Sequence, residues 1–428
     1  MTDPKRTLLR HPDFLKLWTG QTFSQFGTQV TQLALPLIAA NILDVTPFEF
    51  GLLATIEFLP FIFLSLPAGV WVDRLRRRPI LIAGDLGRAA VLISIPVAFA
   101  LDALTIWQLY VVGFLSGCLT VLFDVAYQSY LPTLVERHQL VEGNSKLETS
   151  RSAAQITGPG IAGVAIGALS APLAIVLDSL SYLVSALFVL GIRRREPKPE
   201  RRVDAAGRHV PMRTEIAEGL RYVARHPHLR SIAATTGAAN LFSTIGFGIL
   251  VLFLVRERAF TPELLGFAFS LGSVGFLVGA LVANRLAARF GVGPTIVGSA
   301  LIGGPPLLLV AIAPPDLAFP FVAASGFLEG CAAAVYNINQ VSYRQAVCPE
   351  QMQGRMNATM RFIVWGTIPV GNVLGGFLGG AIGLHSTIWV GAILSLSAFV
   401  PVFLSPVRTI RRMPGPAEVE SAPEGAPA

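Results

Sequence analysis

The chain has 428 residues, of which 53% are hydrophobic and 14% are charged, and its formal net charge is +7. Soluble domains carry roughly 25% charged residues, so this composition excludes an ordinary soluble protein and favours a membrane-embedded one. The basic residues cluster in loops between apolar runs, so membrane topology explains the positive charge and we expect no nucleic-acid partner. The three cysteines, Cys118, Cys331 and Cys348, have neither disulfide-framework nor zinc spacing.

Twelve apolar runs follow one another along the chain, and each is long enough to cross a hydrocarbon core of ~30 Å. Their expected limits are 14–41, 49–72, 79–101, 106–131, 145–168, 172–192, 230–255, 263–285, 293–313, 318–344, 357–381 and 386–406. Barrel strands would be about half as long and would alternate in polarity. Because helices satisfy their own backbone hydrogen bonds in lipid, the sequence predicts an all-α integral membrane protein.

The loops between these spans alternate in their content of lysine and arginine. Basic residues are frequent in the segments 5–16, 74–78 and 193–202. The loops on the opposite side contain acidic residues and only two basic ones: Asp44, Asp102, Asp316, Arg256 and Arg258. The positive-inside rule therefore predicts an even number of spans with both termini in the cytoplasm.

The distribution of polar segments predicts four parts. Residues 1–192 form a first bundle of six helices, and residues 230–409 form a second one. Between them, residues 193–229 begin as a linker rich in Arg, Pro and Glu and continue, from Thr214 to Arg225, as an amphipathic helix on the inner membrane surface. The tail, residues 410–428, is rich in Pro, Ala, Gly and Glu and is expected to be disordered.

An internal repeat relates the two bundles. The stretch from Gly113 to Cys118 returns at an offset of 213 residues, and the same offset relates Asp124 to Asn337 and Gly158 to Gly371. The register has no gap through an intervening polar loop, so spans 4 and 5 match spans 10 and 11. We interpret the chain as a duplication of six spans, with both copies in the same orientation.

The segment from Gly69 to Pro79, between spans 2 and 3, resembles the signature loop of the major facilitator superfamily. With twelve spans in two matching halves, the resemblance covers nearly the whole chain. The resemblance implies two pseudo-symmetric six-helix bundles and a secondary transporter in a bacterial cytoplasmic membrane. A monomer suffices for this fold, so we expect a monomeric protein. The resemblance also implies a cytoplasmic gate, formed by Asp73, Arg74, Arg77 and Arg78. An aspartate beside arginines can form charge-assisted pairs that hold the two bundles together in one state of the transport cycle. The alternative is that the arginines only determine the orientation of the spans in the membrane.

Span 5 contains the order Gly-Pro-x-x-Ala-Gly at Gly158, Pro159 and Gly163, which resembles the antiporter motif of the superfamily. Small residues permit close helix contact and a proline bends a helix. The resemblance implies that this contact favours exchange, whereas ordinary Gly-Pro packing is the alternative. Together with other short matches, the pattern most resembles efflux members of the superfamily, namely enterobactin exporters and macrolide efflux pumps.

Carboxylates within the spans are the candidates for proton coupling: Glu57, Asp124 and Glu329. An ionisable group in a medium of low dielectric constant is costly unless it has a partner or a role. For Asp124, a structural ion pair with Arg88 is the alternative. The position of Asp178 near a helix start, together with Ser179 and Ser181, favours a structural role for this residue. Span 4 has Gly113 where many proton antiporters of the superfamily have an arginine, which argues against a standard coupling mechanism.

Span 1 carries a polar stripe that includes Gln21, Gln25 and Gln29. Such a stripe faces a water-filled cavity or another helix, and we favour the cavity. Asn240 occupies the comparable place in span 7, and Phe26 and Phe58 add aromatic surface for a large amphipathic substrate, although lipid-facing phenylalanines are common.

The sequence contains no phosphate-binding loop of ATPases, no metal cluster and no nucleophile triad, so we expect neither an enzyme nor a cofactor. The function that fits best is proton-driven export of a small amphipathic molecule, such as a drug, an antibiotic or a siderophore-like compound, by alternating access. The alternatives are a nutrient uniporter or symporter of the same fold, and a membrane sensor that transports nothing.

Overall fold

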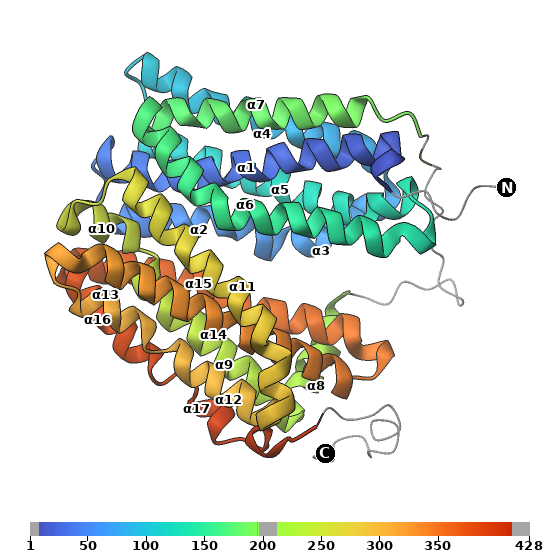
Figure 1. Cartoon of the computed structure of the whole chain (residues 1–428), viewed down its shortest axis with the longest axis vertical. Coiled ribbons are helices and arrows are strands. Elements are labelled where there is room, and N and C mark those ends of the chain that lie inside the picture. The colour runs from blue at the N-terminus through green and yellow to red at the C-terminus, as the bar shows by residue number, and fades with distance from the viewer. Residues whose placement is uncertain (1–7, 195, 197–211, 413–428) are drawn as a thin grey trace. The chain divides into compact units, whose positions relative to one another are not determined.

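The computed structural model describes residues 8–194, 196 and 212–412 (Figure 1). Within this part of the chain the structure consists of helices and turns, without strands. The predicted tail and the first part of the predicted linker lie almost entirely outside the described residues. The side chains of Asp73 and Arg74 also lie outside them, although both residues are in a described helix.

Seven α-helices cover the first six predicted spans: α1 (Pro12–Asn41), α2 (Pro47–Phe63), α3 (Ser65–Arg74), α4 (Arg77–Ala100), α5 (Ile106–Leu134), α6 (Leu140–Leu169) and α7 (Ala171–Leu190). The second span is divided at Leu64. Pro67 has no N–H to donate to the carbonyl of Phe63, which explains the break. At the start of α2, Thr46 and Glu49 form a capping box that fixes where the helix begins.

The remaining α-helices are α8 (Met212–Arg225), α9 (Pro227–Phe247), α10 (Leu250–Arg258), α11 (Pro262–Phe290), α12 (Val292–Gly303), α13 (Pro306–Ile312), α14 (Ala318–Val347), α15 (Glu350–Ile382), α16 (Leu384–Ser395) and α17 (Val400–Phe403). Short 3-10 helices are η1 (Leu8–Arg10), η2 (Arg137–Gln139), η3 (Pro315–Leu317) and η4 (Pro406–Thr409). Spans 7, 9 and 12 are each formed by two consecutive helices.

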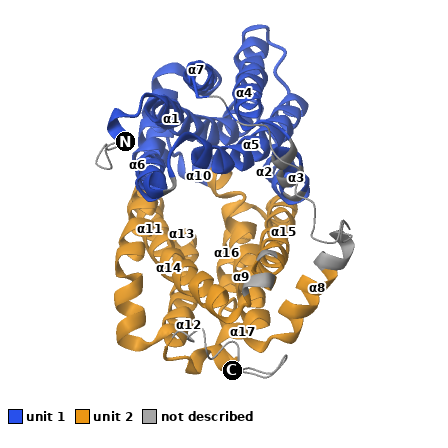
Figure 2. Cartoon of the chain, turned by 90° about the vertical axis from the view of Figure 1, so that its right-hand side faces the viewer, with its two compact units in different colours: residues 1–202, 254–270 blue, residues 203–253, 271–428 orange. Residues whose placement is uncertain are grey.

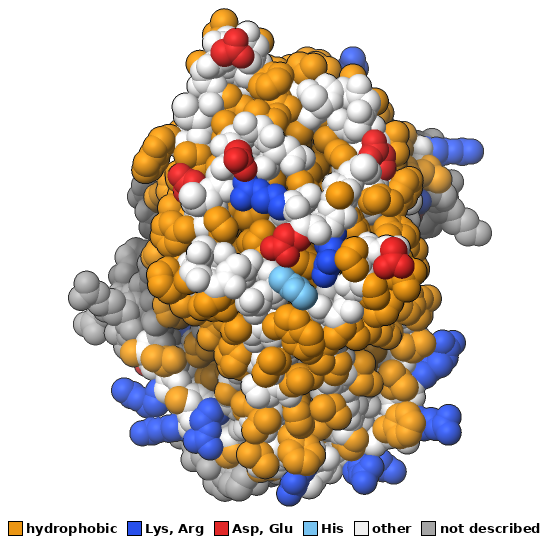
Figure 3. All heavy atoms as spheres, turned by 90° about the vertical axis from the view of Figure 1, so that its left-hand side faces the viewer, with side chains coloured by type: hydrophobic (Ala, Val, Ile, Leu, Met, Phe, Trp, Pro, Cys, Tyr) orange, Lys and Arg blue, Asp and Glu red, His pale blue; other side chains and the backbone are white. Residues whose placement is uncertain are grey.

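Ten helical segments in the described chain are long and apolar enough to cross a membrane. They coincide with predicted spans 3 to 12. The first two predicted spans correspond to α1, which the glutamine stripe makes more polar, and to the α2–α3 pair. Figure 3 looks onto one end of the helices, where hydrophobic side chains cover much of the face and several charged side chains and a histidine lie among them. The predicted all-α membrane fold is confirmed.

The chain divides into two compact units (Figure 2). The first comprises residues 1–202 together with 254–270, so the end of α10 and the first turns of α11 belong to it. Within it, α7 packs against α1 and α4, and α5 packs against α4 and α2. A core around Phe14, Leu81 and Tyr130 holds these helices together.

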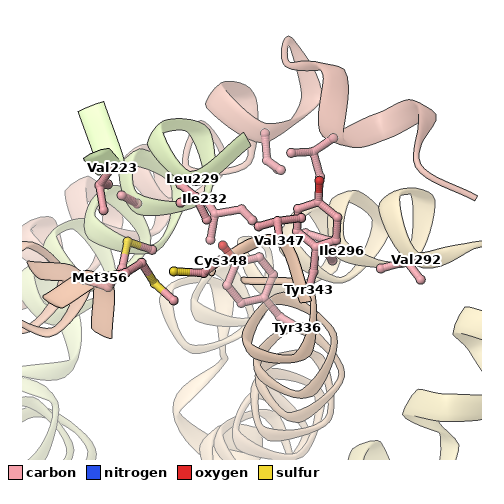
Figure 4. Close-up of a cluster of buried hydrophobic side chains, with 14 of the residues drawn as sticks. Val223, Leu229, Ile232, Val292, Ile296, Tyr336, Tyr343, Val347, Cys348 and Met356 are labelled. Carbon is pink, nitrogen blue, oxygen red and sulfur yellow. The ribbon is translucent and has the colours of Figure 1, made fainter. Parts of the chain in front are cut away.

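The second unit comprises residues 203–253 and 271–428. One of its cores gathers Val223, Ile232, Tyr343, Cys348 and Met356 from α8, α9, α14, the turn after α14 and α15 (Figure 4). The amphipathic helix expected from the sequence is therefore present as α8, but its apolar side packs on α15. Glu218 of α8 also forms an ion pair with Arg355 of α15, at 2.6 Å. The sequence indicated the helix and its polarity, but not this protein partner.

Candidate functional site

The signature loop joins α3 to α4, and two of its arginines, Arg77 and Arg78, bind residues of the same unit. The backbone N–H of Arg77 donates to Glu196 Oε1 at 2.9 Å, and its guanidinium forms an ion pair with the same oxygen at 3.2 Å. Arg78 donates to the carbonyls of Val189 and Leu190 at the end of α7. Glu196 thus places a negative charge at the N-terminus of α4, where the helix dipole favours it. The sequence did not single out Glu196, because it lies in a segment interpreted as linker.

The glycine-rich motif of α6 permits close contacts at its two ends. A Cβ on Gly158 would collide with the side chain of Gln29, and a Cβ on Gly163 would collide with the backbone of Pro262 at the start of α11. Between them, the backbone N–H of Gly160 donates to Ser270 Oγ at 2.9 Å. The motif therefore packs against α1 and the first turns of α11, which belong to the same unit.

The polar stripe of α1 faces other helices at several of its positions. Gln21 is buried, and its amide donates to Ser185 Oγ of α7 at 3.4 Å. Thr28 forms a hydrogen bond with the hydroxyl of Tyr182 at 2.9 Å, and Gln29 contacts Gly158 of α6. At Gln21 the structure favours the other alternative, in which the stripe faces a neighbouring helix.

Two further candidates for the substrate cavity, Gln25 and Phe26, are half-buried on α1. Phe58 stacks on Phe61 along α2, with ring centroids 5.7 Å apart.

Glu57 lies against the helix that carries Gly113. A Cβ on Gly113 would be 2.8 Å from Cγ of Glu57, so only glycine leaves room for this side chain. Within the described residues, Oε1 of Glu57 is buried without a hydrogen-bond partner. A buried carboxylate oxygen without a partner is costly when it is ionised. The glycine that departs from the pattern of many antiporters therefore accommodates an acid on the neighbouring helix.

A second acidic region surrounds Arg88 of α4. Its guanidinium forms an ion pair with Asp85 at 2.5 Å, one turn earlier in the same helix. The guanidinium carbon lies 4.2 Å from the ring centroid of Phe123 and 4.1 Å from that of Tyr182. Asp85 is fully buried and Arg88 is 4% exposed, so the aromatic rings replace water around the cation.

Asp124 of α5 is exposed in the structure, whereas Asp178 of α7 lies inside the unit. Asp178 is fully buried and accepts hydrogen bonds from Thr31 of α1 and from Ser181, which supports the structural role expected for it. The sequence raised a pairing of Asp124 with Arg88, but the direct partner of Arg88 is Asp85, which it missed. The i, i+3 spacing of Asp85 and Arg88 was the signal available. Within the described residues, the direct carboxylate partner of this buried cation is therefore Asp85.

The second unit contains a cavity of about 320 Å³ that Glu329 lines from α14. Asn240 and Ser243 of α9 contribute polar groups, and Tyr336 and Trp365 contribute aromatic ones. The amide of Asn240 donates to the carbonyl of Val364 at 2.9 Å, and Thr236 forms a hydrogen bond with the Tyr336 hydroxyl at 2.8 Å. Glu329 and Asn240, singled out separately from the sequence, therefore line one cavity.

Bundles of long apolar helices with acidic residues buried inside them define a transporter-type membrane protein. A family model described as "Transmembrane secretion effector" matches residues 6–418, and the chain belongs to this family. The membership places it in the major facilitator superfamily and among transporters of small molecules rather than enzymes. In the part of the chain that the structure describes, no group of three or more His, Cys, Asp or Glu side chains is arranged to hold a metal ion.

Several curated proteins are similar along nearly their whole length. The multidrug efflux pump Tap of Mycolicibacterium fortuitum is 28% identical over 96% of this chain and 98% of its own. The uncharacterized MFS-type transporter YfiS of Bacillus subtilis is 26% identical over 89% of this chain and 88% of its own. The macrolide efflux protein A of Streptococcus pyogenes is 23% identical over 93% and 97%.

Solved structures of the same fold include a bacterial homologue of the iron transporter ferroportin in an inward-facing state. Its TM-score is 0.74 at 16% identity, with 93% of this chain and 99% of that chain covered. A variant of the nucleoside transporter NupG also gives a TM-score of 0.74, at 14% identity, with 92% and 99% covered. At these identities the likeness establishes the fold.

Proposed function

We propose that the protein exports small amphipathic molecules across the cytoplasmic membrane and that proton influx drives the export. The observation that carries this proposal is the similarity to the efflux pump Tap over 96% of the chain, within a family defined by secretion. The macrolide efflux protein A points to the same direction of transport. Large amphipathic antibiotics are therefore the first substrates to test.

The cavity of the second unit supports this substrate class. Its lining combines the carboxylate of Glu329 with amide and hydroxyl groups and with the rings of Tyr336 and Trp365. Mostly apolar and aromatic walls with a few polar groups suit a drug-sized molecule with one polar end. Asn240 helps to shape this wall, whereas the proposed contribution of Gln25, Phe26 and Phe58 rests on their place in α1 and α2.

Proton coupling is assigned to Glu57, Asp124 and Glu329. The side chain of Glu57 supports this role, because one of its carboxyl oxygens is buried without a hydrogen-bond partner. Burying such a group costs least when it is protonated, so ionisation requires a new partner or contact with water. Asp124 is exposed on α5, so its assignment rests on its place within the fourth span. An alternating-access cycle changes the surroundings of both acids. We assign to the antiporter motif of α6, at Gly158, Pro159 and Gly163, the helix contacts that change in the same cycle.

The proposal extends to topology and gating. The alternation of basic loops supports both termini in the cytoplasm, and a monomer suffices for the mechanism. Asp73 and Arg74 remain the proposed movable part of the cytoplasmic gate. Arg77 and Arg78 hold Glu196 and the end of α7, so we assign them the fixed side of that gate.

The direct cellular test compares a deletion strain carrying the wild-type gene with one carrying Glu329→Gln. Wild-type protein is expected to lower the accumulation of erythromycin or ethidium several-fold, and the variant is expected to lose this effect at equal expression. The exposed Glu148→Gln is the matched control and is expected to behave like wild type. Equal accumulation with and without the wild-type gene for a broad panel of amphipathic antibiotics would contradict the proposal.

A further inference from the structure

A pocket of about 520 Å³ lies in the second unit where α11 ends and α12 begins. Three arginines line it: Arg289 at the end of α11, and Arg411 and Arg412 after η4. Asn284 and Ser342, whose side chains can donate hydrogen bonds, also line it. Among the described residues that line this pocket, none is acidic.

Contacts with Phe290 position two of the three arginines. Arg411 donates to the carbonyl of Phe290 at 3.0 Å, which fixes its guanidinium at the rim of the pocket. The guanidinium carbon of Arg289 lies 5.5 Å from the ring centroid of Phe290. In the part of the chain that the structure describes, the ion pairs involve other basic residues. Three arginines therefore line one pocket, and their guanidinium groups retain N–H donors for a ligand.

The internal repeat accounts for the lack of an acid at one described position of this pocket. The pocket includes the second copy of the signature loop, in which Asn284 and Arg285 take the places of Asp73 and Arg74. The first copy retains a carboxylate at the helix end, whereas the second offers an amide there. In the second copy an asparagine replaces the acid, Arg285 and Arg289 take the places of Arg74 and Arg78, and alanines take those of Arg76 and Arg77. Without this carboxylate, the guanidinium groups of the pocket are available to an external anion.

We propose that this pocket binds a phosphate-bearing anion, with guanidinium groups as the main ligands. Arginine matches the geometry of phosphate oxygens, and the amide of Asn284 and the hydroxyl of Ser342 complete the donor set. The pocket lies at the end of a membrane-spanning helix, and Phe290 beside it is 50% exposed. An apolar side chain next to three cations fits an acidic lipid, whose head group enters the pocket while its acyl chains follow the helix.

The test uses the full-length protein purified in detergent and titrated with phosphatidylglycerol, with phosphatidylcholine or with inorganic phosphate, and monitored by native mass spectrometry. The triple variant Arg289→Gln, Arg411→Gln, Arg412→Gln removes the cations of the pocket. The control is Arg408→Gln, an arginine of η4 outside the pocket, whose guanidinium carbon lies 5.9 Å from the ring centroid of Phe403. We expect phosphatidylglycerol to bind the triple variant at least about tenfold more weakly than wild type or the control.

The two sources of phosphate separate in the same titration. Binding of phosphatidylglycerol that millimolar inorganic phosphate does not displace assigns the pocket to a lipid head group, whereas saturable binding of inorganic phosphate with little preference for the lipid assigns it to a soluble phosphate. The proposal is overturned if the triple variant binds both ligands as wild type does. It is also overturned if Arg408→Gln weakens binding as much, since that would indicate nonspecific attraction to a basic surface.

Discussion

Glu57 of α2 occupies the space that a side chain at position 113 of α5 would fill, because a Cβ on Gly113 would lie 2.8 Å from Cγ of Glu57. The replacement Gly113→Ala therefore forces the carboxylate out of its buried position. We expect the transport rate of this variant to fall several-fold and to respond less to the proton gradient. Its insertion into the membrane is expected to be unchanged. Proton-linked transport in vesicles measures the first effect and the amount of folded protein measures the second.

The matched control for that variant is Gly298→Ala, because nothing lies within 4 Å of the added Cβ there. Alanine also has the higher helix propensity, so this control is expected to be neutral or slightly stabilising. Wild-type transport in Gly113→Ala would show that the position of Glu57 does not matter for coupling.

Arg88 is expected to be necessary for the stability of the first unit. Replacing it by glutamine leaves Asp85 buried without its cation, and losing one partner of a buried ion pair costs roughly 3–5 kcal/mol. We expect a marked fall in the thermal unfolding temperature of the purified protein. The double variant Asp85→Asn, Arg88→Gln is expected to recover part of the loss, since it leaves less charge unpaired.

The exposed pair Arg151–Glu148 is the control for this experiment. Its side chains are 58% and 67% exposed, so Arg151→Gln is expected to change stability by at most about 1 kcal/mol. If Arg88→Gln unfolds at the wild-type temperature, the guanidinium is not what stabilises the cluster of carboxylates.

His226 predicts a component of acid sensitivity outside the membrane. Burial is the main reason, and the neighbouring His228 a second one, why the pKa of His226 is lowered from 6.5 to about 4. The unfolded chain therefore binds a proton between about pH 6.5 and 4 that the folded protein does not bind, and this group destabilises the fold as the pH falls through that window. Thermal unfolding at several pH values between 7 and 4.5 measures the effect.

The variant His226→Asn isolates that contribution. His226 caps α9 by accepting a hydrogen bond from the N–H of Leu229, and asparagine is also a good N-cap. We expect the variant to have a smaller difference in unfolding temperature between pH 7 and 5 than wild type has. An identical pH dependence in both proteins would assign the acid sensitivity to other groups.

Glu329 is expected to separate binding from coupling. Because it lines a cavity together with Asn240 and Trp365, Glu329→Gln is expected to retain substrate exchange but to lose acceleration by a proton gradient. Exchange is measured in proteoliposomes with and without an imposed gradient, and Asn240→Ala is expected to lower apparent affinity instead. Full proton-driven transport by Glu329→Gln would remove this residue from the coupling candidates.

The sequence predicted the membrane spans well, because apolar length and loop charge carry that information directly. It did not predict that spans such as 292–312 consist of two helices, since short breaks at Gly304 and Pro305 leave hydropathy unchanged. For the site, it identified Glu57, Asp124 and Glu329 as individual acids. It missed the pairing of Asp85 with Arg88 and the fit between Glu57 and Gly113, because these depend on which helix faces meet. The partner of Gln21 was unpredictable for the same reason.

Accumulation of erythromycin or ethidium in everted membrane vesicles tests the central claim most directly. In such vesicles an exporter moves its substrate into the lumen, and an acidic lumen supplies protons that flow outward through the protein. Wild-type protein is expected to accumulate the compound only with this gradient, and a protonophore is expected to abolish the accumulation. Gradient-independent equilibration, or movement of the compound out of the lumen, would contradict proton-driven export.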